Sequence, residues 1–266
     1  MSERGERTMA TAALRAMARQ ELRDLWWGGR GLPLMLGYTV LLSVTSYLVA
    51  ANKALNFLEQ REAVSLTLQL AVAVAALLVL LAAADAISGE RERGTLEPLL
   101  LTPAPRSALV AGKAIAAMSL WLVGYLLALP YVAYLARGTQ VTTKALVSGA
   151  VVGLLVAGFL CGLGLTVSAL ARSNRIASAT SLFVLLAAFV PTQLPSAAQH
   201  GTFGEALLRA DPVTAGLHYL SELVVAGHGP TRDVDWLIGP LALAALTGLS
   251  AALVSTRLQL LSGARS

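Results

Sequence analysis

Six long stretches of the chain are almost wholly apolar, and short polar or charged segments separate them. Each stretch is near the roughly 20 residues that a helix needs to cross the hydrocarbon core of a bilayer. Because the stretches are rich in leucine and alanine, which favour helices, we expect an all-α integral membrane protein. The six transmembrane helices are predicted at Leu32–Ala51, Ala63–Ile87, Ala114–Leu135, Ala145–Ala171, Ile176–Leu194 and Trp236–Thr256.

An amphipathic pattern precedes the first apolar stretch. Within Ala13–Trp27, apolar residues recur at spacings of three and four, and arginines occupy the other side. Trp26 and Trp27 close the segment, as in helices that lie in the membrane interface. We therefore expect an interfacial helix, which serves either as a plain anchor or as part of a gate. The predicted division is a tail with this helix in residues 1–31 and a six-helix transmembrane domain in residues 32–266.

Composition and charge support a membrane protein and indicate how the chain is oriented in the membrane. Hydrophobic residues make up 56% of the chain and charged residues 13%, whereas soluble domains carry about 25% charged residues. Most of the 20 lysines and arginines lie on the side of the two termini, and basic residues are enriched in cytoplasmic loops. We expect cytoplasmic termini in a bacterial-type plasma (inner) membrane. The net charge of +5 is explained by anionic lipid, without nucleic acid.

The loop after the second span, at about residues 88–106, carries a distinctive pattern. It begins with four alternating charges, Glu90–Arg93, which we expect to end the span, because each would cost about 2.5–3.5 kcal/mol at the bilayer centre. Three leucines at helical spacing follow, before a Thr-Pro pair. The pattern predicts a small helix with an exposed apolar stripe, either a protein-binding surface or a helix resting in the head groups. The leucines are Leu96, Leu99 and Leu100.

This loop resembles the cytoplasmic loop of type-2 ABC transporter permeases. The resemblance is carried by the run from Glu90 to Glu97 and by Leu99-Leu100, Thr102-Pro103, Arg106 and Gly112-Lys113. An interfacial helix, six spans and a long external segment between the last two spans fit the same family. The resemblance implies a coupling helix that docks into a groove of an ATP-hydrolysing subunit. It assigns to that contact Glu90, Arg91, Glu92, Arg93, Gly94, Thr95, Leu96, Glu97, Leu99 and Leu100.

We expect the chain itself not to hydrolyse ATP. A P-loop needs Gly-x4-Gly-Lys-Ser/Thr to cradle the phosphates, but Gly112-Lys113 is followed by Ala114 and has Ser107 in place of the first glycine. The resemblance therefore implies a separate ABC ATPase that binds ATP and magnesium, with no cofactor in this chain. It also implies a second permease, either another copy or a homologue, and a path lined by the second and fifth spans.

Two further patterns concern the path. The fourth span has small-xxx-small spacings, at Gly149/Gly153 and Gly158/Gly162, which allow close helix packing; packing within one protomer is favoured over dimerisation. Few ionisable residues lie deep in any span, which disfavours ion coupling and favours a lipid-like or apolar cargo.

In the external segment, about residues 195–235, Asp211-Pro212 predicts a helix start. This segment is a candidate gate or a simple cap.

Other chemistries find little support in the sequence. His200, His218 and His228 lack the spacing of metal ligands, no span combines Ser250 with a histidine as an intramembrane protease would need, and Cys161 fits a small buried residue. No catalytic or metal-binding residues are assigned.

We predict the membrane subunit of an ABC exporter. The alternatives are a non-transporting scaffold or assembly factor that binds a soluble partner through the same loop, and, third, a membrane-embedded enzyme.

Overall fold

The structure is a computed structural model. It describes residues 3–51, 57–96, 98, 101, 105–139, 141–188, 204, 208–227, 229 and 231–262. Three of the residues assigned to the ATPase contact, Glu97, Leu99 and Leu100, lie outside the described residues, as do the last six residues of the predicted fifth span and most of the external segment up to residue 207.

The described chain is all-helical, as the sequence predicted. Five of its helices are long and apolar enough to cross a membrane by length and composition. The helices are α1 (Glu3–Trp26), α2 (Gly31–Ala51), α3 (Phe57–Glu92), α5 (Arg106–Leu135), α6 (Thr142–Leu170), α7 (Asn174–Ala188), α10 (Pro212–Val224) and α11 (Ile238–Ser262), with the short 3-10 helix η2 (Val234–Leu237) before α11.

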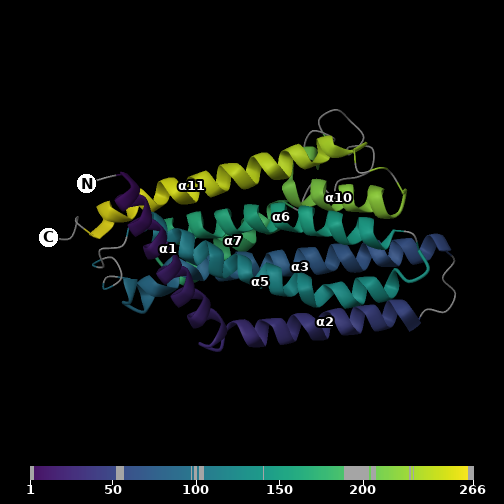
Figure 1. The fold of residues 1–266 in the computed structure, drawn as a ribbon, viewed down its shortest axis with the longest axis horizontal. Helices are drawn as coiled ribbons and strands as arrows, with labels where there is room; N and C mark the ends of the chain where they lie inside the picture. The colour runs from purple at the N-terminus through teal and green to yellow at the C-terminus, as the bar shows by residue number, and fades with distance from the viewer. Residues whose placement is uncertain are drawn as a thin grey trace.

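The long helices run side by side in an elongated bundle (Figure 1). Helix α1 crosses one end of this bundle at a steep angle, and α10 packs at the opposite end. We call these the α1 end and the α10 end. The long helices from α2 to α6 alternate in direction, because short connections join them: α5 and α6, for example, are linked through residues 136–141.

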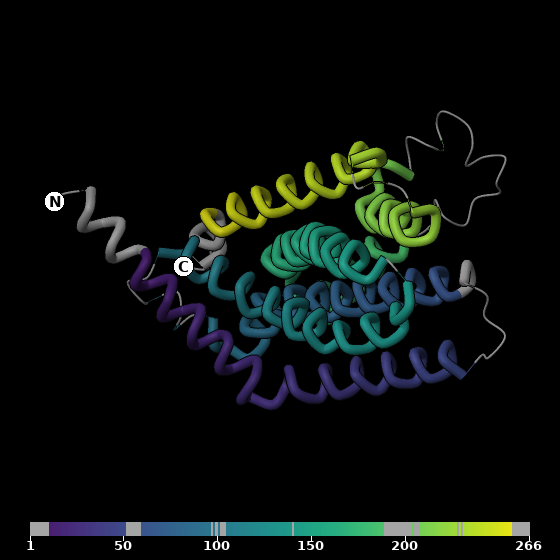
Figure 2. Tube along the Cα trace, turned by 45° about the vertical axis from the view of Figure 1, so that its right-hand side comes forward, coloured from purple at the N-terminus to yellow at the C-terminus, as the bar shows by residue number. Residues whose placement is uncertain are grey.

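Helices α3 and α6 form the centre of the bundle, and α2 and α11 lie at its two sides (Figure 2). The central helices bury leucine, valine and alanine on most of their surface, including Leu68, Leu80 and Leu160. The outer helices keep large apolar side chains exposed, among them Leu36 of α2 and Leu249 of α11. An exposed apolar surface over full helix lengths is what lipid tails require.

The glycines of α6 allow close packing within the chain. A Cβ on Gly162 would lie 2.6 Å from the backbone carbon of Thr247 in α11, and one on Gly153 would lie 2.7 Å from Trp121 Nε1 in α5. By contrast, a Cβ on Gly158 would meet nothing within 4 Å. The preference for packing within one protomer is therefore confirmed for Gly162 and Gly153.

Three expectations concern where helices begin and end. Helix α3 continues through Glu92, so it ends within the run of charges, five residues beyond the predicted end of the second span at Ile87. Helix α7 has 15 described residues, fewer than a full span needs, so the described residues contain five long apolar helices rather than six. The predicted N-terminal helix is present as α1 and begins earlier than predicted, at Glu3 rather than Ala13.

Candidate functional site

The alternating charges occupy the last turn of α3, and a glycine ends the helix directly after them. Gly94 has a φ of +69°, which glycine adopts without the strain of a Cβ. Its N–H donates to the carbonyl of Arg91, and the N–H of Thr95 donates to the carbonyl of Glu90 at 3.0 Å. This pair of bonds is the Schellman motif. The glycine of the Glu-Arg-Glu-Arg-Gly run therefore sets the point where the chain leaves α3.

A buried lysine joins α3 to α1 and α5. Lys113 of α5 has a side chain only 1% exposed. Its Nζ donates to Glu21 Oε1 of α1 at 2.8 Å and also to Glu90 Oε1 of α3. Two carboxylates thus share one cation. Burial raises the pKa of Glu21 above its ordinary value, against the opposing effects of the charge and hydrogen bond of Lys113 and with smaller raising contributions from Glu90 and Asp24.

The next two charges connect α3 to the hairpin between α6 and α7. The guanidinium of Arg91 donates to the carbonyl of Ala169, at 3.0 Å, and to that of Ala171. These carbonyls stand at the C-terminal end of α6, where a cation is favourable. Glu92 Oε1 accepts the backbone N–H of Asn174 at 2.8 Å. Asn174 begins α7, and an acceptor with negative charge is stabilised there by the helix dipole.

A fourth connection runs through Asp85. Its carboxylate accepts from Arg30 Nη1, just before α2, at 2.6 Å and from Asn174 Nδ2 at 2.7 Å. Arg93 Nη2 lies 3.8 Å from the same carboxylate. Gly89 leaves room for this group, because a Cβ there would lie 2.2 Å from Asp85 Oδ1. We call Glu21, Asp85, Glu90, Arg91, Glu92, Lys113 and Asn174 the α3-end cluster.

Of the described leucines in the loop between Gly94 and Arg106, one is buried and one is exposed. Leu96 is 7% exposed and belongs to the hydrophobic core, so the expectation of an exposed stripe is wrong for this residue. Pro98 is exposed, and Leu101 is 86% exposed. Residues 96 and 98 are helical, in agreement with a short helix in the loop. Leu96 anchors this loop to the bundle, and Leu101 presents an apolar side chain outward.

Helix α1 is fixed against α5 by close contact. A Cβ on Gly112 of α5 would lie 3.1 Å from the Cβ of Met17, so the two helices cross with almost no space between their backbones. At the end of α1, Trp26 Nε1 donates to Ser119 Oγ of α5 at 3.0 Å. Together with the Glu21–Lys113 pair, these contacts hold the interfacial helix to the α1 end of the bundle.

The α10 end has its own polar contacts. Asp211 caps α10, and its carboxylate accepts from the N–H groups of Val213 and Thr214, which confirms the predicted helix start. Arg209 lies 3.1 Å from Asp235 Oδ2 and stacks on Trp236. These contacts tie the segment before α10 to the start of the last long helix.

Sequence reasoning missed several members of the α3-end cluster. It assigned Glu90, Arg91, Glu92 and Arg93 to an outside partner, whereas the structure gives each a contact inside the chain. It missed Glu21 and Asn174 altogether. One signal was present: Lys113 is a lone charge in an apolar helix, and such a residue requires a counter-ion. Among the residues that the structure describes, no group of three or more His, Cys, Asp or Glu could hold a metal ion.

The fold and the α3-end cluster define a helical membrane protein whose spans are joined by charged contacts at one end. The family model described as ABC-2 family transporter protein matches residues 15–228. The chain therefore belongs to the ABC-2 transporter family, and it is of the membrane permease type. None of the curated proteins compared with the chain matches it.

Proposed function

We propose that the chain is the permease subunit of an ATP-driven ABC exporter and that the loop after α3 docks a separate ATPase. The proposal rests on the different contacts that the residues before and after Gly94 make. The charges before Gly94 bind other helices of the chain, and the loop after it turns an apolar side chain, Leu101, outward. Leu99 and Leu100 precede Leu101 in the sequence, and a contiguous apolar surface is typical of a protein contact.

In this proposal the α3-end cluster transmits motion. Nucleotide binding draws two ATPases together and displaces the loop around Leu101. The displacement reaches α3 through the anchor at Leu96. From α3 it passes to α5 through Glu90 and Lys113, and to α7 through Glu92 and Asn174. Rigid helices joined by ion pairs move together, which suits rocking of the whole bundle rather than movement of one helix.

The proposal includes an orientation and a sixth span. The α1 end faces the cytoplasm of a bacterial-type plasma membrane, which the excess of basic residues on that side supports. The chain must pass from Asn174 at the α1 end to Pro212 in the α10 helix, and α7 is the described start of that passage (Figure 1). We assign the predicted fifth span, Ile176–Leu194, to this passage; its described part is α7.

A second copy of the permease completes the path. Helix α7 exposes Leu182, Phe183 and Leu186, with Phe183 72% exposed. Helix α7 packs against α3, the other helix that the family resemblance assigns to the path. In the described spans, acidic and basic residues lie toward the helix ends, which supports a lipid-like or otherwise apolar cargo over an ion.

The test is assembly and ATP hydrolysis with Leu101→Asp. The protein is co-expressed with the ABC ATPase of the neighbouring reading frame, and co-purification and ATP hydrolysis are measured. Thr143→Asp, at an exposed position near the start of α6, is the matched control. We expect Leu101→Asp to lose most co-purified ATPase while its thermal stability stays unchanged, and Thr143→Asp to behave like the wild type. Full assembly of Leu101→Asp would overturn the docking and favour a scaffold function.

A further inference from the structure

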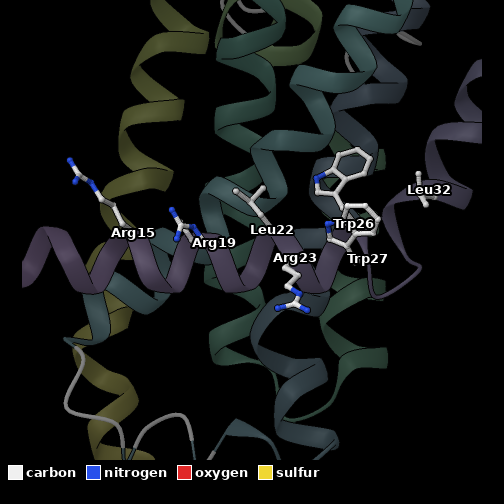
Figure 3. A pocket seen from close by; sticks show the side chains of 8 residues that line it. Arg15, Arg19, Leu22, Arg23, Trp26, Trp27 and Leu32 are labelled. Carbon is white, nitrogen blue, oxygen red and sulfur yellow. The ribbon is translucent and has the colours of Figure 1, made fainter.

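A groove runs along α1 where it meets α2. It has a volume of about 850 Å³ and is lined by α1 residues between Arg15 and Trp26, by Trp27 directly after α1, and by Leu32 of α2. Figure 3 shows the side chains of Arg15, Arg19, Leu22 and Trp26 extending to the same side of α1, the side on which the long helices run. The groove therefore lies on the side of α1 that faces the long helices.

Three arginines of α1 border the groove, whose lining is otherwise apolar. Arg15, Arg19 and Arg23 follow at intervals of four residues, so they lie one turn apart on α1. All three are exposed, and no ion pair within the described residues neutralises them. Arg15 and Arg19 share the side of Leu22, whereas Arg23 extends to the other side (Figure 3). Exposed guanidinium groups are planar, permanently charged donors that suit phosphate.

The rest of the groove lining is apolar and open. Trp27 is 84% exposed and Leu32 is 56% exposed. Trp26 forms the wall between them and the bundle, held by its hydrogen bond to Ser119. Exposed tryptophan and leucine beside arginines fit the boundary between head groups and acyl chains, where tryptophan is enriched.

We propose that this groove binds one anionic phospholipid, with its phosphate on Arg15 and Arg19 and the upper part of an acyl chain against Leu22, Trp27 and Leu32. Charge complementarity selects an anionic head group, and the apolar wall selects a lipid over a free phosphate, which would leave that wall exposed. Because α1 is fixed to α5 at Gly112 and Trp26, the groove keeps its shape without the lipid. The proposal is independent of ATPase docking.

The test is native mass spectrometry of the detergent-purified full chain titrated with phosphatidylglycerol and, separately, with phosphatidylcholine. Three proteins are compared: the wild type, Arg15→Gln/Arg19→Gln, and Arg172→Gln/Arg175→Gln. The last variant removes the same charge from exposed positions at the same end of the bundle, between α6 and α7. A fourth sample contains the wild type with an excess of glycerol 3-phosphate, which carries the anionic group without an acyl chain.

We expect the wild type to prefer phosphatidylglycerol and the Arg15/Arg19 variant to lose about tenfold to thirtyfold of that preference. The Arg172/Arg175 variant should keep it, and glycerol 3-phosphate should not displace the lipid. Equal binding of the two lipids by the wild type, or equal losses in both double variants, would overturn the site. Displacement by glycerol 3-phosphate would assign the arginines to a soluble phosphate instead.

Discussion

Lys113 Nζ lies 2.8 Å from Glu21 Oε1 although 92 residues separate them in the sequence. The same Nζ contacts Glu90, so one buried cation joins α1, α5 and the end of α3. A buried charge is stable only when it is paired and hydrogen-bonded. By neutralising Glu21 and Glu90, Lys113 therefore holds α1, α3 and α5 together at the α1 end of the bundle.

Replacing Lys113 should destabilise the fold strongly. Lys113→Met leaves two largely buried carboxylates without a cation, and we expect a loss of about 3 kcal/mol in the free energy of unfolding. Thermal unfolding in detergent measures it, with the exposed Lys144→Met as a control within about 0.5 kcal/mol of the wild type. The triple variant Lys113→Met/Glu21→Gln/Glu90→Gln should recover most of the loss. An unchanged stability of Lys113→Met would contradict the central role of the pair.

The stability should also depend on the protonation of Glu21. Burial raises the pKa of Glu21 above 4.5, so the folded state binds this proton more tightly than the unfolded state does. Its contribution to the free energy of unfolding is then highest at low pH and falls as the pH rises from about 4.5 through the raised pKa. Subtracting the stability of Glu21→Gln at each pH isolates this contribution. A difference that rises with pH would mean that the pair with Lys113 outweighs burial.

The two kinds of glycine in α6 allow a paired test of packing. Gly162→Ala would push a methyl group against the backbone of Thr247, and we expect a loss of about 1–3 kcal/mol, as in other overpacked sites. Gly158→Ala places the same methyl group in open space and should be neutral. The two thermal midpoints are compared in one detergent. Equal effects would contradict the contact between α6 and α11.

The proposed second copy predicts cross-linking through α7. In a Cys161→Ser background, Phe183→Cys should form a disulfide-linked dimer in membranes on oxidation, because its exposed face is assigned to the partner. Leu36→Cys and Leu249→Cys, exposed on the outer helices α2 and α11, serve as controls and should stay monomeric. Dimers formed through the outer helices, with none through α7, would move the interface away from α7.

The sequence predicted the helices well because their signals are local. The apolar runs that became α2, α5 and α6 are long and continuous, and Asp211-Pro212 carries its own cap. The predicted second span stops at Ile87, whereas α3 continues as a helix to Glu92. The penalty for a charge in a membrane assumes that the charge has no partner. Glu90, Arg91 and Glu92 each have one, supplied by α5, α6 and α7.

The charged contacts could not be predicted, because they depend on how distant segments meet. Nothing local pairs Asn174 with Asp85, which lies 89 positions earlier. Spacing alone also gave Leu96 an exposed position, since a helical stripe does not reveal which side the rest of the fold covers. Leu96 packs into the core instead.

The measurement that tests ATPase docking most directly is thiol protection at Leu101. Cys161 is the chain's single cysteine and is buried, so Cys161→Ser/Leu101→Cys carries one accessible thiol. Labelling with a maleimide dye is followed for the permease alone and for its complex with the ATPase, with Cys161→Ser/Thr143→Cys as a control. We expect the ATPase to slow labelling at position 101 at least tenfold and to leave position 143 unaffected. Equal labelling of position 101 in both states would contradict docking at this loop.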